Sequence, residues 1–281
     1  MKIWILGRDG LLGKELARQC DDQKIAKVAT NREEADITDF KKLTQVAEKE
    51  KVTHIVNCAA YTDVDKAESQ PEIAYQVNAD GPEHLAIVAR QCGARLIHIS
   101  TDYVFDGQKR QPYGESDACK PTGVYAHSKW VGENRLLEHF PSACILRTSW
   151  LFGKGGKNFI SSLLSRFATN EEVRVVTDQT GRPTYCRDLA EAVLSLLCHS
   201  GIYHFANRGE ASRFRIAEEL LKKAQERGIK MACRTLIPVL SKEFPTPAPR
   251  PAYSVLATEK IERVLGKPPR PWTDVVDEYL R

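Results

Sequence analysis

The sequence predicts an α/β protein built around a parallel sheet. In its first half, short apolar runs alternate with longer amphipathic runs, an order that is typical of βαβ units. A glycine-rich segment at 7–13 follows the first apolar run and precedes the first amphipathic run. A segment of this kind between a strand and a helix is typical of dinucleotide-binding proteins. We therefore expect a Rossmann-like, doubly wound parallel sheet with a small interleaved C-terminal α/β substrate lobe.

The elements follow from the same pattern. Strands are expected at 3–6, 25–29, 54–60, 96–99 and 143–146, where short apolar runs are bounded by Gly, Asn, Ser or Asp. Helices are expected between them at 11–20, 40–51, 72–91 and 124–140. The second half is less regular, with helices expected at 159–168, 189–198, 214–227 and 272–280 and strands at 173–176 and 202–205. We expect an NAD(P)-binding domain of residues 1–150 with parts of 173–205, and a substrate lobe of about 151–172 and 206–281.

Composition narrows the class of protein. The chain has 281 residues, and its 41 Lys and Arg against 37 Asp and Glu give a net charge of +4 that is spread along the sequence. This mild charge argues against a nucleic-acid partner and suits a small anionic ligand. No apolar run approaches the roughly 20 residues that a bilayer requires, and the apolar N-terminal stretch is too short for a signal peptide. The eight cysteines form no C-x-x-C pair, so we expect reduced cysteines, no metal site and a cytoplasmic protein.

The glycine-rich segment is the first candidate site. Its residues read Gly-Arg-Asp-Gly-Leu-Leu-Gly, which is a G-x-x-G-x-x-G spacing. Glycines allow a tight turn and a close approach of the backbone to a pyrophosphate, and the following helix offers free N–H groups. The spacing predicts that Gly7, Gly10 and Gly13 bind a dinucleotide. A strand-to-helix turn without any ligand is the alternative interpretation.

The end of the second predicted strand bears on the choice of cofactor. Sites that prefer NAD usually place an acidic residue there to bond the ribose 2′-hydroxyl. Asn31 and Arg32 stand at this position instead, and Arg8 lies in the neighbouring loop. Two guanidinium groups near a 2′-phosphate favour NADPH. NADH remains possible, because both arginines also suit an ordinary solvated surface.

A Tyr-x-x-x-Lys pattern at Tyr125 and Lys129 is the candidate catalytic pair. Residues four apart share one face of a helix, so the phenol and the ammonium project together. We expect the cation to lower the pKa of the phenol and make Tyr125 a proton donor near neutral pH. Thr101 ends the fourth predicted strand, at the sheet edge where ligands of open α/β folds bind. His98 and His127 are interpreted as structural residues.

Longer strings carry a resemblance. Residues 64–68 read Val-Asp-Lys-Ala-Glu and residues 100–107 read Ser-Thr-Asp-Tyr-Val-Phe-Asp-Gly. With the glycine segment and the Tyr-x-x-x-Lys pair, they make the chain resemble the extended short-chain dehydrogenase/reductases. Within these it is most similar to the dTDP-4-dehydrorhamnose reductases, nearly from end to end. This resemblance implies an NADPH-dependent oxidoreductase that reduces the C4 keto group of dTDP-4-dehydro-L-rhamnose to dTDP-L-rhamnose, for polysaccharide biosynthesis.

The resemblance also implies residue roles. The implied catalytic residues are Thr101, Tyr125 and Lys129. The implied cofactor contacts are Gly7, Gly10, Leu11, Leu12, Gly13, Asn31, Arg32, Asp36, Ile37, Ala59, Ala60, Tyr61, Thr62, Ile99, Tyr125 and Lys129. The implied substrate contacts are Thr101, Asp102, Tyr125, Trp150 and Arg250, with Arg250 toward the nucleotide diphosphate.

Some alternatives stay open at this point. The enzyme could be another nucleotide-sugar 4-ketoreductase, an epimerase or a dehydratase, and a non-catalytic regulatory subunit of the same fold is the alternative outside enzymes. Asp9 is electrostatically unfavourable beside a pyrophosphate unless it caps the first helix. Some relatives hold magnesium between subunits through carboxylates, for which Glu15 is a candidate. A homodimer is possible.

Overall fold

The computed structural model describes all of residues 1–281, and its centre is a six-stranded sheet. Every neighbouring pair of its strands is parallel, in the order β10-β5-β4-β3-β1-β2. The strands are β1 (Ile3–Leu6), β2 (Lys27–Thr30), β3 (His54–Asn57), β4 (Arg95–Thr101), β5 (Cys144–Thr148) and β10 (Gly201–Phe205). The predicted Rossmann-like parallel sheet is confirmed, and these strands lie at the predicted positions to within a few residues.

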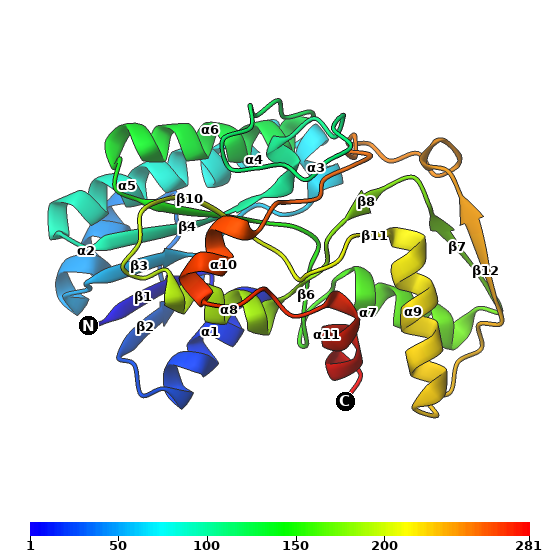
Figure 1. Cartoon of the computed structure of the whole chain (residues 1–281). Helices are drawn as coiled ribbons and strands as arrows, with labels where there is room; N and C mark the ends of the chain where they lie inside the picture. The colour runs from blue at the N-terminus through cyan, green and yellow to red at the C-terminus, as the bar shows by residue number, and fades with distance from the viewer.

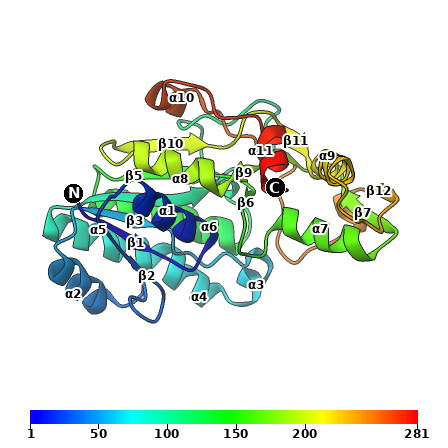
Figure 2. The same cartoon turned by 90° about the horizontal axis from the view of Figure 1, so that it is seen from below.

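Helices cover both faces of the sheet (Figures 1 and 2). Helices α1 (Leu11–Asp22), α8 (Cys186–Ser195) and α10 (Glu259–Leu265) share one apolar core with the sheet, in which Leu16, Val193 and Ile261 are fully buried. Helices α2 (Phe40–Glu50), α5 (Gly81–Cys92) and α6 (Val124–His139) share the core on the other face, which includes Leu43, Leu85 and Leu136. The sheet is therefore doubly wound, as predicted.

The single helix predicted over 72–91 is wrong. The chain forms α4 (Pro71–Tyr75), a π-helical turn η1 (Gln76–Asp80) and then α5. Helix α6 packs so closely on this turn that a Cβ on Gly132 would lie 1.9 Å from the Asn78 carbonyl oxygen. Wide turns of this kind are frequent at functional sites, and this one brings Asn78 toward helix α6, which carries Tyr125 and Lys129. The short helices α3 (Val64–Ser69) and η2 (Asp102–Val104) were not predicted.

A third apolar core forms the smaller lobe at the right of Figure 1. It is built from α7 (Phe159–Thr169), α9 (Arg213–Glu226), α11 (Trp272–Tyr279), β7 (Glu172–Val176) and β12 (Thr235–Val239). Strands β7 and β12 pair in parallel. Strand β12 was not predicted, because it contains Pro238 and only its last residue is buried. The domain boundaries given above stay a prediction.

Short strand pairs lie between the main sheet and the smaller lobe (Figure 1). Strand β6 (Leu151–Phe152) pairs with β9 (Thr184–Tyr185), and β8 (Thr180–Gly181) pairs with β11 (Ala211–Ser212). The 3-10 turn η3 (Ser241–Glu243) follows β12. All eight cysteines are free thiols. None of the helices has the length and apolar character that crossing a membrane would require.

Candidate active site

The glycine segment forms a closely packed turn between β1 and α1. Gly7 has φ +80°, and a Cβ there would lie 2.8 Å from the backbone nitrogen of Ala59. A Cβ on Gly13 would lie 2.2 Å from the Gly7 carbonyl oxygen. No side chain caps the N-terminus of α1, where Gly10 is the N-cap. The turn therefore fits a pyrophosphate, because bare backbone and uncapped N–H groups lie where an anion would bind.

Asp9 does not cap this helix. Its carboxylate is well exposed and lies 3.6 Å from Nε of Arg8. The neighbouring guanidinium partly compensates the negative charge that would face a pyrophosphate. The N–H groups of the first turn of α1 are thus left for a ligand.

The end of β2 carries an acidic residue that the sequence analysis missed. Glu34 pairs with Arg8 at 3.1 Å and accepts a hydrogen bond from the backbone N–H of Asn31 at 3.0 Å. In return, the Asn31 side chain accepts from the backbone N–H of Glu34 at 3.1 Å. This reciprocal pattern between residues three apart is that of a capping box. The Asn-x-x-Glu spacing of Asn31 and Glu34 in the sequence could therefore have indicated Glu34. Arg32 is 80% exposed and pairs with Asp36.

Asp36 stabilises the turn after β2. One of its oxygens accepts from the backbone N–H and the hydroxyl of Thr38, at 2.9 and 2.8 Å. Partial burial alone would raise the pKa of Asp36, but hydrogen bonds from Thr38 and Arg32 outweigh it and lower the pKa. Ile37 is buried, and a Cβ on Gly81 would lie 2.8 Å from its side chain.

Asn78 joins the loop after β3 to helix α6. Its oxygen accepts from the backbone N–H of Tyr61 at 2.9 Å, and its nitrogen donates to the Tyr61 carbonyl at 3.1 Å. The same nitrogen donates to the Ser128 hydroxyl at 3.1 Å. Residues 60–62 are thereby fixed beside α6. Asn78 was not predicted as a site residue, although Gly81-Pro82 within the predicted helix indicated an irregularity there.

Thr101, Asp102 and Tyr125 meet at the carboxyl end of β4. The Thr101 hydroxyl donates to Asp102 at 3.1 Å and accepts from the backbone N–H of Tyr103 at 3.2 Å. Burial raises the pKa of Tyr125, and the neighbouring Thr101 hydroxyl only partly opposes this. The predicted lowering of the Tyr125 pKa is therefore wrong in this structure, because desolvation of the phenolate is the largest effect.

Lys129 is 2% exposed and points at strand β4. Its Nζ donates to the Ile99 carbonyl at 2.8 Å and lies 3.2 Å from Nε2 of His98. Burial lowers the pKa of Lys129 to about 8, although Glu133 opposes the shift. His98 is fully buried, and it contacts Lys129, which its interpretation as a structural residue did not anticipate. His127 is exposed and bonds Tyr75 at 2.6 Å.

Trp150 and Arg213 form an aromatic and cationic wall beside this group. Trp150 has φ +46°, a strained conformation for a bulky residue. Its ring carries the Arg213 guanidinium 4.2 Å from the centroid. A Cβ on Gly181 would lie 2.7 Å from the same ring. Arg213 was missed, because it lies in the lobe beyond any motif and only the chain fold brings it here.

Helix α3 connects α6 with the proline-rich segment 245–251, which precedes helices α10 and α11. Glu68 accepts from the backbone N–H of Val124, at the start of α6, at 2.8 Å. Asp65 accepts from Arg250 at 2.9 Å and from the backbone N–H of Ala248 at 3.1 Å. Nη1 of Arg250 is buried without a hydrogen-bond partner. The Val-Asp-Lys-Ala-Glu string thus has a positioning role for both lobes.

Asp102 gives a pH-dependent prediction. Burial raises its pKa to about 6, while the hydrogen bond from Thr101 opposes the shift. A raised folded-state pKa means that its contribution to stability is fully present below the unfolded value of about 3.9 and is lost as pH rises through about 6. Between pH 4 and pH 7, we expect the unfolding free energy of the unmodified protein to fall by on the order of 3 kcal/mol more than that of Asp102→Asn. Denaturant titrations of both proteins at several pH values measure this, and parallel pH curves would contradict it.

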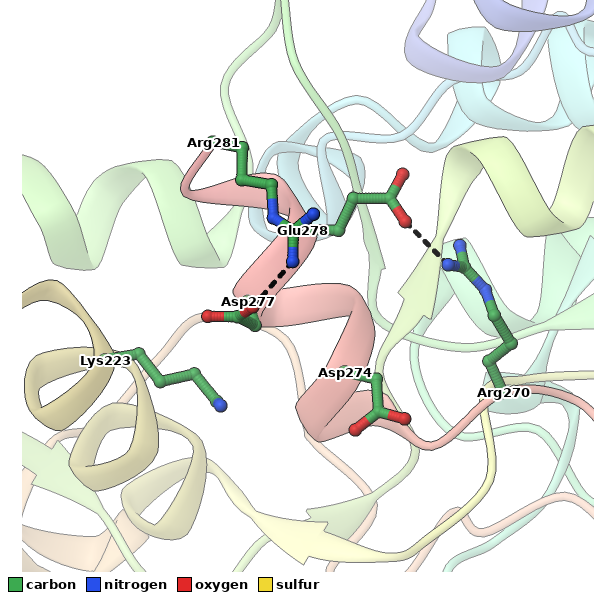
Figure 3. A pocket seen from close by; sticks show the side chains of 6 residues that line it. All are labelled: Lys223, Arg270, Asp274, Asp277, Glu278 and Arg281. Atoms are coloured by element: carbon green, nitrogen blue, oxygen red, sulfur yellow. Dashed lines mark hydrogen bonds and ion pairs between the residues drawn. The ribbon is translucent and has the colours of Figure 1, made fainter. Parts of the chain in front are cut away.

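A charged pocket near the C-terminus contains none of the predicted site residues. A pocket of about 400 Å³ is lined only by polar, charged side chains (Figure 3). These are Lys223, Arg270, Asp274, Asp277, Glu278 and Arg281. Nothing in this lining suits a nicotinamide or a sugar ring.

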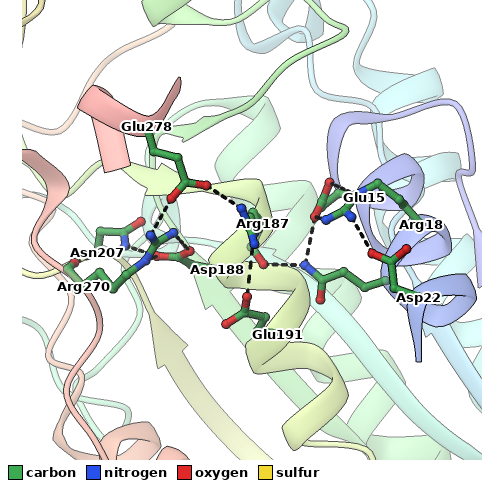
Figure 4. A network of polar contacts seen from close by, with 10 residues as sticks. Glu15, Arg18, Asp22, Arg187, Asp188, Glu191, Asn207, Arg270 and Glu278 are labelled. Atoms are coloured by element: carbon green, nitrogen blue, oxygen red, sulfur yellow. Dashed lines mark hydrogen bonds and ion pairs between the residues drawn. The ribbon is translucent and has the colours of Figure 1, made fainter. Parts of the chain in front are cut away.

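The interfacial magnesium considered for Glu15 is not supported. Its carboxylate accepts from Arg18 at 2.6 Å and from Gln19 at 2.9 Å (Figure 4). Arg187 bonds Glu278 at 2.7 Å in the same network. No group of three or more His, Cys, Asp or Glu side chains in the chain could hold a metal ion. Arginine side chains satisfy these carboxylates, so the network is one of ion pairs.

Comparisons with known proteins agree with this geometry. Residues 1–281 match the family described as the RmlD substrate binding domain. A dTDP-4-dehydrorhamnose reductase of Mycobacterium tuberculosis is 41% identical over 99% of this chain and 92% of its own length. The spore coat polysaccharide biosynthesis protein SpsK of Bacillus subtilis is 38% identical over 100% of this chain and 97% of its own length. The crystal structure of a dTDP-4-dehydrorhamnose reductase from Bacillus anthracis in complex with NADP is 34% identical, with a TM-score of 0.93 over 99% of this chain and 98% of that chain. The chain therefore belongs to the RmlD substrate binding domain family, that of the dTDP-4-dehydrorhamnose reductases.

Proposed function

We propose that this protein reduces the C4 keto group of dTDP-4-dehydro-L-rhamnose with NADPH and forms dTDP-L-rhamnose. The observation that carries the proposal is that Tyr125 lies beside Thr101 and Asp102, which are hydrogen-bonded to each other, at the carboxyl end of β4. The carboxyl end of a parallel sheet is where open α/β folds bind their ligands. The family membership and the names of the relatives support the same reaction.

Tyr125 is the proposed proton donor. Because burial raises its pKa, the phenol keeps its proton at neutral pH, as a reduction requires. Bound NADPH would supply the hydride to C4 of the sugar. Tyr125 donates its proton to the oxygen that becomes an alkoxide, and Thr101 turns its hydroxyl from Asp102 to stabilise the same oxygen.

Unpartnered polar atoms identify the proposed sugar contacts. Oδ2 of Asp102 is buried without a hydrogen-bond partner and would accept from a sugar hydroxyl. The ring of Trp150 would lie against the sugar. The free Nη1 of Arg250 and the guanidinium of Arg213 would bind the diphosphate, since arginine is well suited to phosphate oxygens.

The proposed cofactor site follows the edge of the sheet from β1 to β4. Gly7, Gly10 and Gly13 would approach the pyrophosphate together with Leu11 and Leu12. The adenine end would meet Asn31, Arg32, Asp36 and Ile37, and the middle of the cofactor would meet Ala59, Ala60, Tyr61 and Thr62. Ile99 and Lys129 would lie at the nicotinamide ribose.

Arg8 and Arg32 should set the preference for NADPH. We expect Arg8→Ala or Arg32→Ala to lower kcat/KM for NADPH by about tenfold or more and to leave kcat/KM for NADH nearly unchanged. Each charge-assisted hydrogen bond to the 2′-phosphate contributes about 1.5–3 kcal/mol. Steady-state kinetics with both cofactors tests this, with the exposed Arg90→Ala on α5 as the control. Equal losses with both cofactors would argue against a 2′-phosphate site.

The second candidate function is reduction of another nucleotide-linked 4-keto sugar. A panel of dTDP- and UDP-linked 4-keto sugars, each with NADPH, separates the two through their kcat/KM values. A cytoplasmic location belongs to the proposal, because eight free thiols suit a reducing compartment. A homodimer stays a prediction, to be checked by light scattering.

A further inference from the structure

Two buried side chains near the proposed sugar site have oxygen atoms without a hydrogen-bond partner. They are Asp102, which follows β4, and Ser254, which lies in the segment before α10, and they are 2% and 1% exposed. The two atoms are Oδ2 of Asp102 and Oγ of Ser254. A buried polar atom without a partner costs free energy. Both oxygens are therefore suited to a polar group of a ligand.

The backbone places Ser254 beside the ring of Trp150. The N–H of Ser254 donates to the Thr180 carbonyl at 2.8 Å, and the N–H of Thr180 donates to the Ala252 carbonyl at 2.8 Å. Strand β8 thus holds this segment in place. Its second residue is Gly181, where a Cβ would lie 2.7 Å from the Trp150 ring and 3.2 Å from Oγ of Ser254. The Ser254 hydroxyl therefore lies next to the ring that we propose for the sugar.

Asp102 connects this hydroxyl with the catalytic group. Its Oδ1 accepts from the Thr101 hydroxyl at 3.1 Å, and Ser254 lies close enough to Asp102 to oppose the rise of its pKa that burial causes. Thr101 is the proposed partner of the C4 oxygen. Because Oδ1 and Oδ2 belong to one carboxylate, Oδ2 would face a substituent on a carbon next to C4. In a 4-keto-6-deoxy sugar, C5 carries the methyl group and the ring oxygen, so only C3 offers a hydroxyl there.

We propose that Ser254 is a further substrate-binding residue, which holds the C3 hydroxyl of the sugar together with Oδ2 of Asp102. This inference rests on the proposed reduction of a 4-keto sugar. An ionised carboxylate only accepts hydrogen bonds, whereas a serine hydroxyl also donates them. A sugar hydroxyl donates to Asp102 and accepts from Ser254 at the same time. A keto, deoxy or methoxy group at C3 has no proton for Asp102, so the pair selects sugars with a free C3 hydroxyl.

Calorimetric titration with dTDP-L-rhamnose, the proposed product, tests the inference without turnover. We expect Ser254→Ala to weaken the binding of dTDP-L-rhamnose about tenfold, because one hydrogen bond in a buried site is lost. Binding of dTDP, which has no sugar, should change less than about twofold, and this also shows that the variant is folded. Should Ser254→Ala not fold, Ser254→Cys keeps the size of the side chain and has only a weak hydrogen-bond donor.

Two analogues of dTDP-L-rhamnose identify the hydroxyl that Ser254 binds. The analogue without the C3 hydroxyl should bind the unmodified protein at least about a hundredfold more weakly, because it leaves Asp102 and Ser254 unpaired. Ser254→Ala should then cause no further loss. With the analogue that lacks the C2 hydroxyl instead, Ser254→Ala should cause the same tenfold loss as with dTDP-L-rhamnose.

Ser100→Ala is the matched control. Ser100 is 4% exposed, and its hydroxyl is also buried without a partner. Ser100 precedes Thr101 on β4, and side chains alternate between the two faces of a strand, so Ser100 points to the opposite side from Thr101. We expect Ser100→Ala to change the affinity for dTDP-L-rhamnose by less than about twofold.

Two results would overturn the inference. One is an unchanged affinity of Ser254→Ala for dTDP-L-rhamnose, which would show that the hydroxyl does not contact the sugar. The other is a tenfold loss in Ser254→Ala that persists with the analogue lacking the C3 hydroxyl, which would assign Ser254 to another part of the sugar. An unmodified protein that binds dTDP-L-rhamnose no more tightly than dTDP would contradict the proposed function, and the inference with it.

Discussion

Tyr125→Phe is expected to lower kcat by about 10²–10⁴-fold, the usual contribution of a positioned general acid. The phenol is the only group that the proposed mechanism places to protonate the C4 oxygen, and phenylalanine keeps the ring but has no proton to give. Single-turnover absorbance at the reduced-nicotinamide band measures the loss.

Two controls make this result specific to proton donation. NADPH affinity, measured by fluorescence titration, should change less than about threefold, since an interaction used only in the transition state affects kcat rather than binding. Tyr75→Phe removes a phenol that bonds the exposed His127, on another face of α6 from Tyr125, and should leave kcat unchanged. A Tyr125→Phe enzyme with more than a tenth of the original kcat would remove Tyr125 from its proposed role.

Glu133→Ala is expected to destabilise the protein by about 3–5 kcal/mol, which is the usual effect of breaking a buried ion pair. Glu133 and Arg147 are 2–3% exposed and lie 2.6 Å apart. Loss of the carboxylate leaves a buried guanidinium whose other neighbours, Cys119 and His204, cannot neutralise it. A fall of the Tm on the order of 10 °C follows from the size of the chain.

The matched control is a carboxylate in an exposed pair. Glu191 lies 4.0 Å from Arg187 and is about half exposed, so Glu191→Ala should change stability by less than about 0.5 kcal/mol. Urea denaturation gives both values. A cost below about 1 kcal/mol for Glu133→Ala would show that water or another group reaches Arg147.

Local pattern was sufficient for the main sheet and its helices. The apolar runs of β1 and β5 lie within regular βαβ units, and the glycine spacing marks the turn between β1 and α1. The formation of such regular helices and strands depends mainly on residues that are close in the sequence, so a single sequence is sufficient to predict them. The π-helical turn and β12 were missed because contacts with α6 and β7 stabilise them, and such contacts are not visible in the order of residues.

The candidate site divides in the same way. Thr101, Tyr125 and Lys129 stand in recognisable strings, and the structure places all three around the carboxyl end of β4. Arg213 and Asn78 reach the site through tertiary packing. The expected lowering of the Tyr125 pKa failed for a related reason, since burial depends on the whole fold and a Tyr-x-x-x-Lys spacing does not contain it.

The central claim is net reduction of a nucleotide-linked 4-keto sugar. It is tested most directly by incubating the purified protein with NADPH and dTDP-4-dehydro-L-rhamnose and measuring both NADPH and the sugar product. We expect one NADPH to be consumed for each dTDP-L-rhamnose formed. We also expect Tyr125→Phe to abolish both the NADPH consumption and the formation of dTDP-L-rhamnose. A rearranged sugar without NADPH consumption, or no product from a protein that binds NADPH, would contradict it.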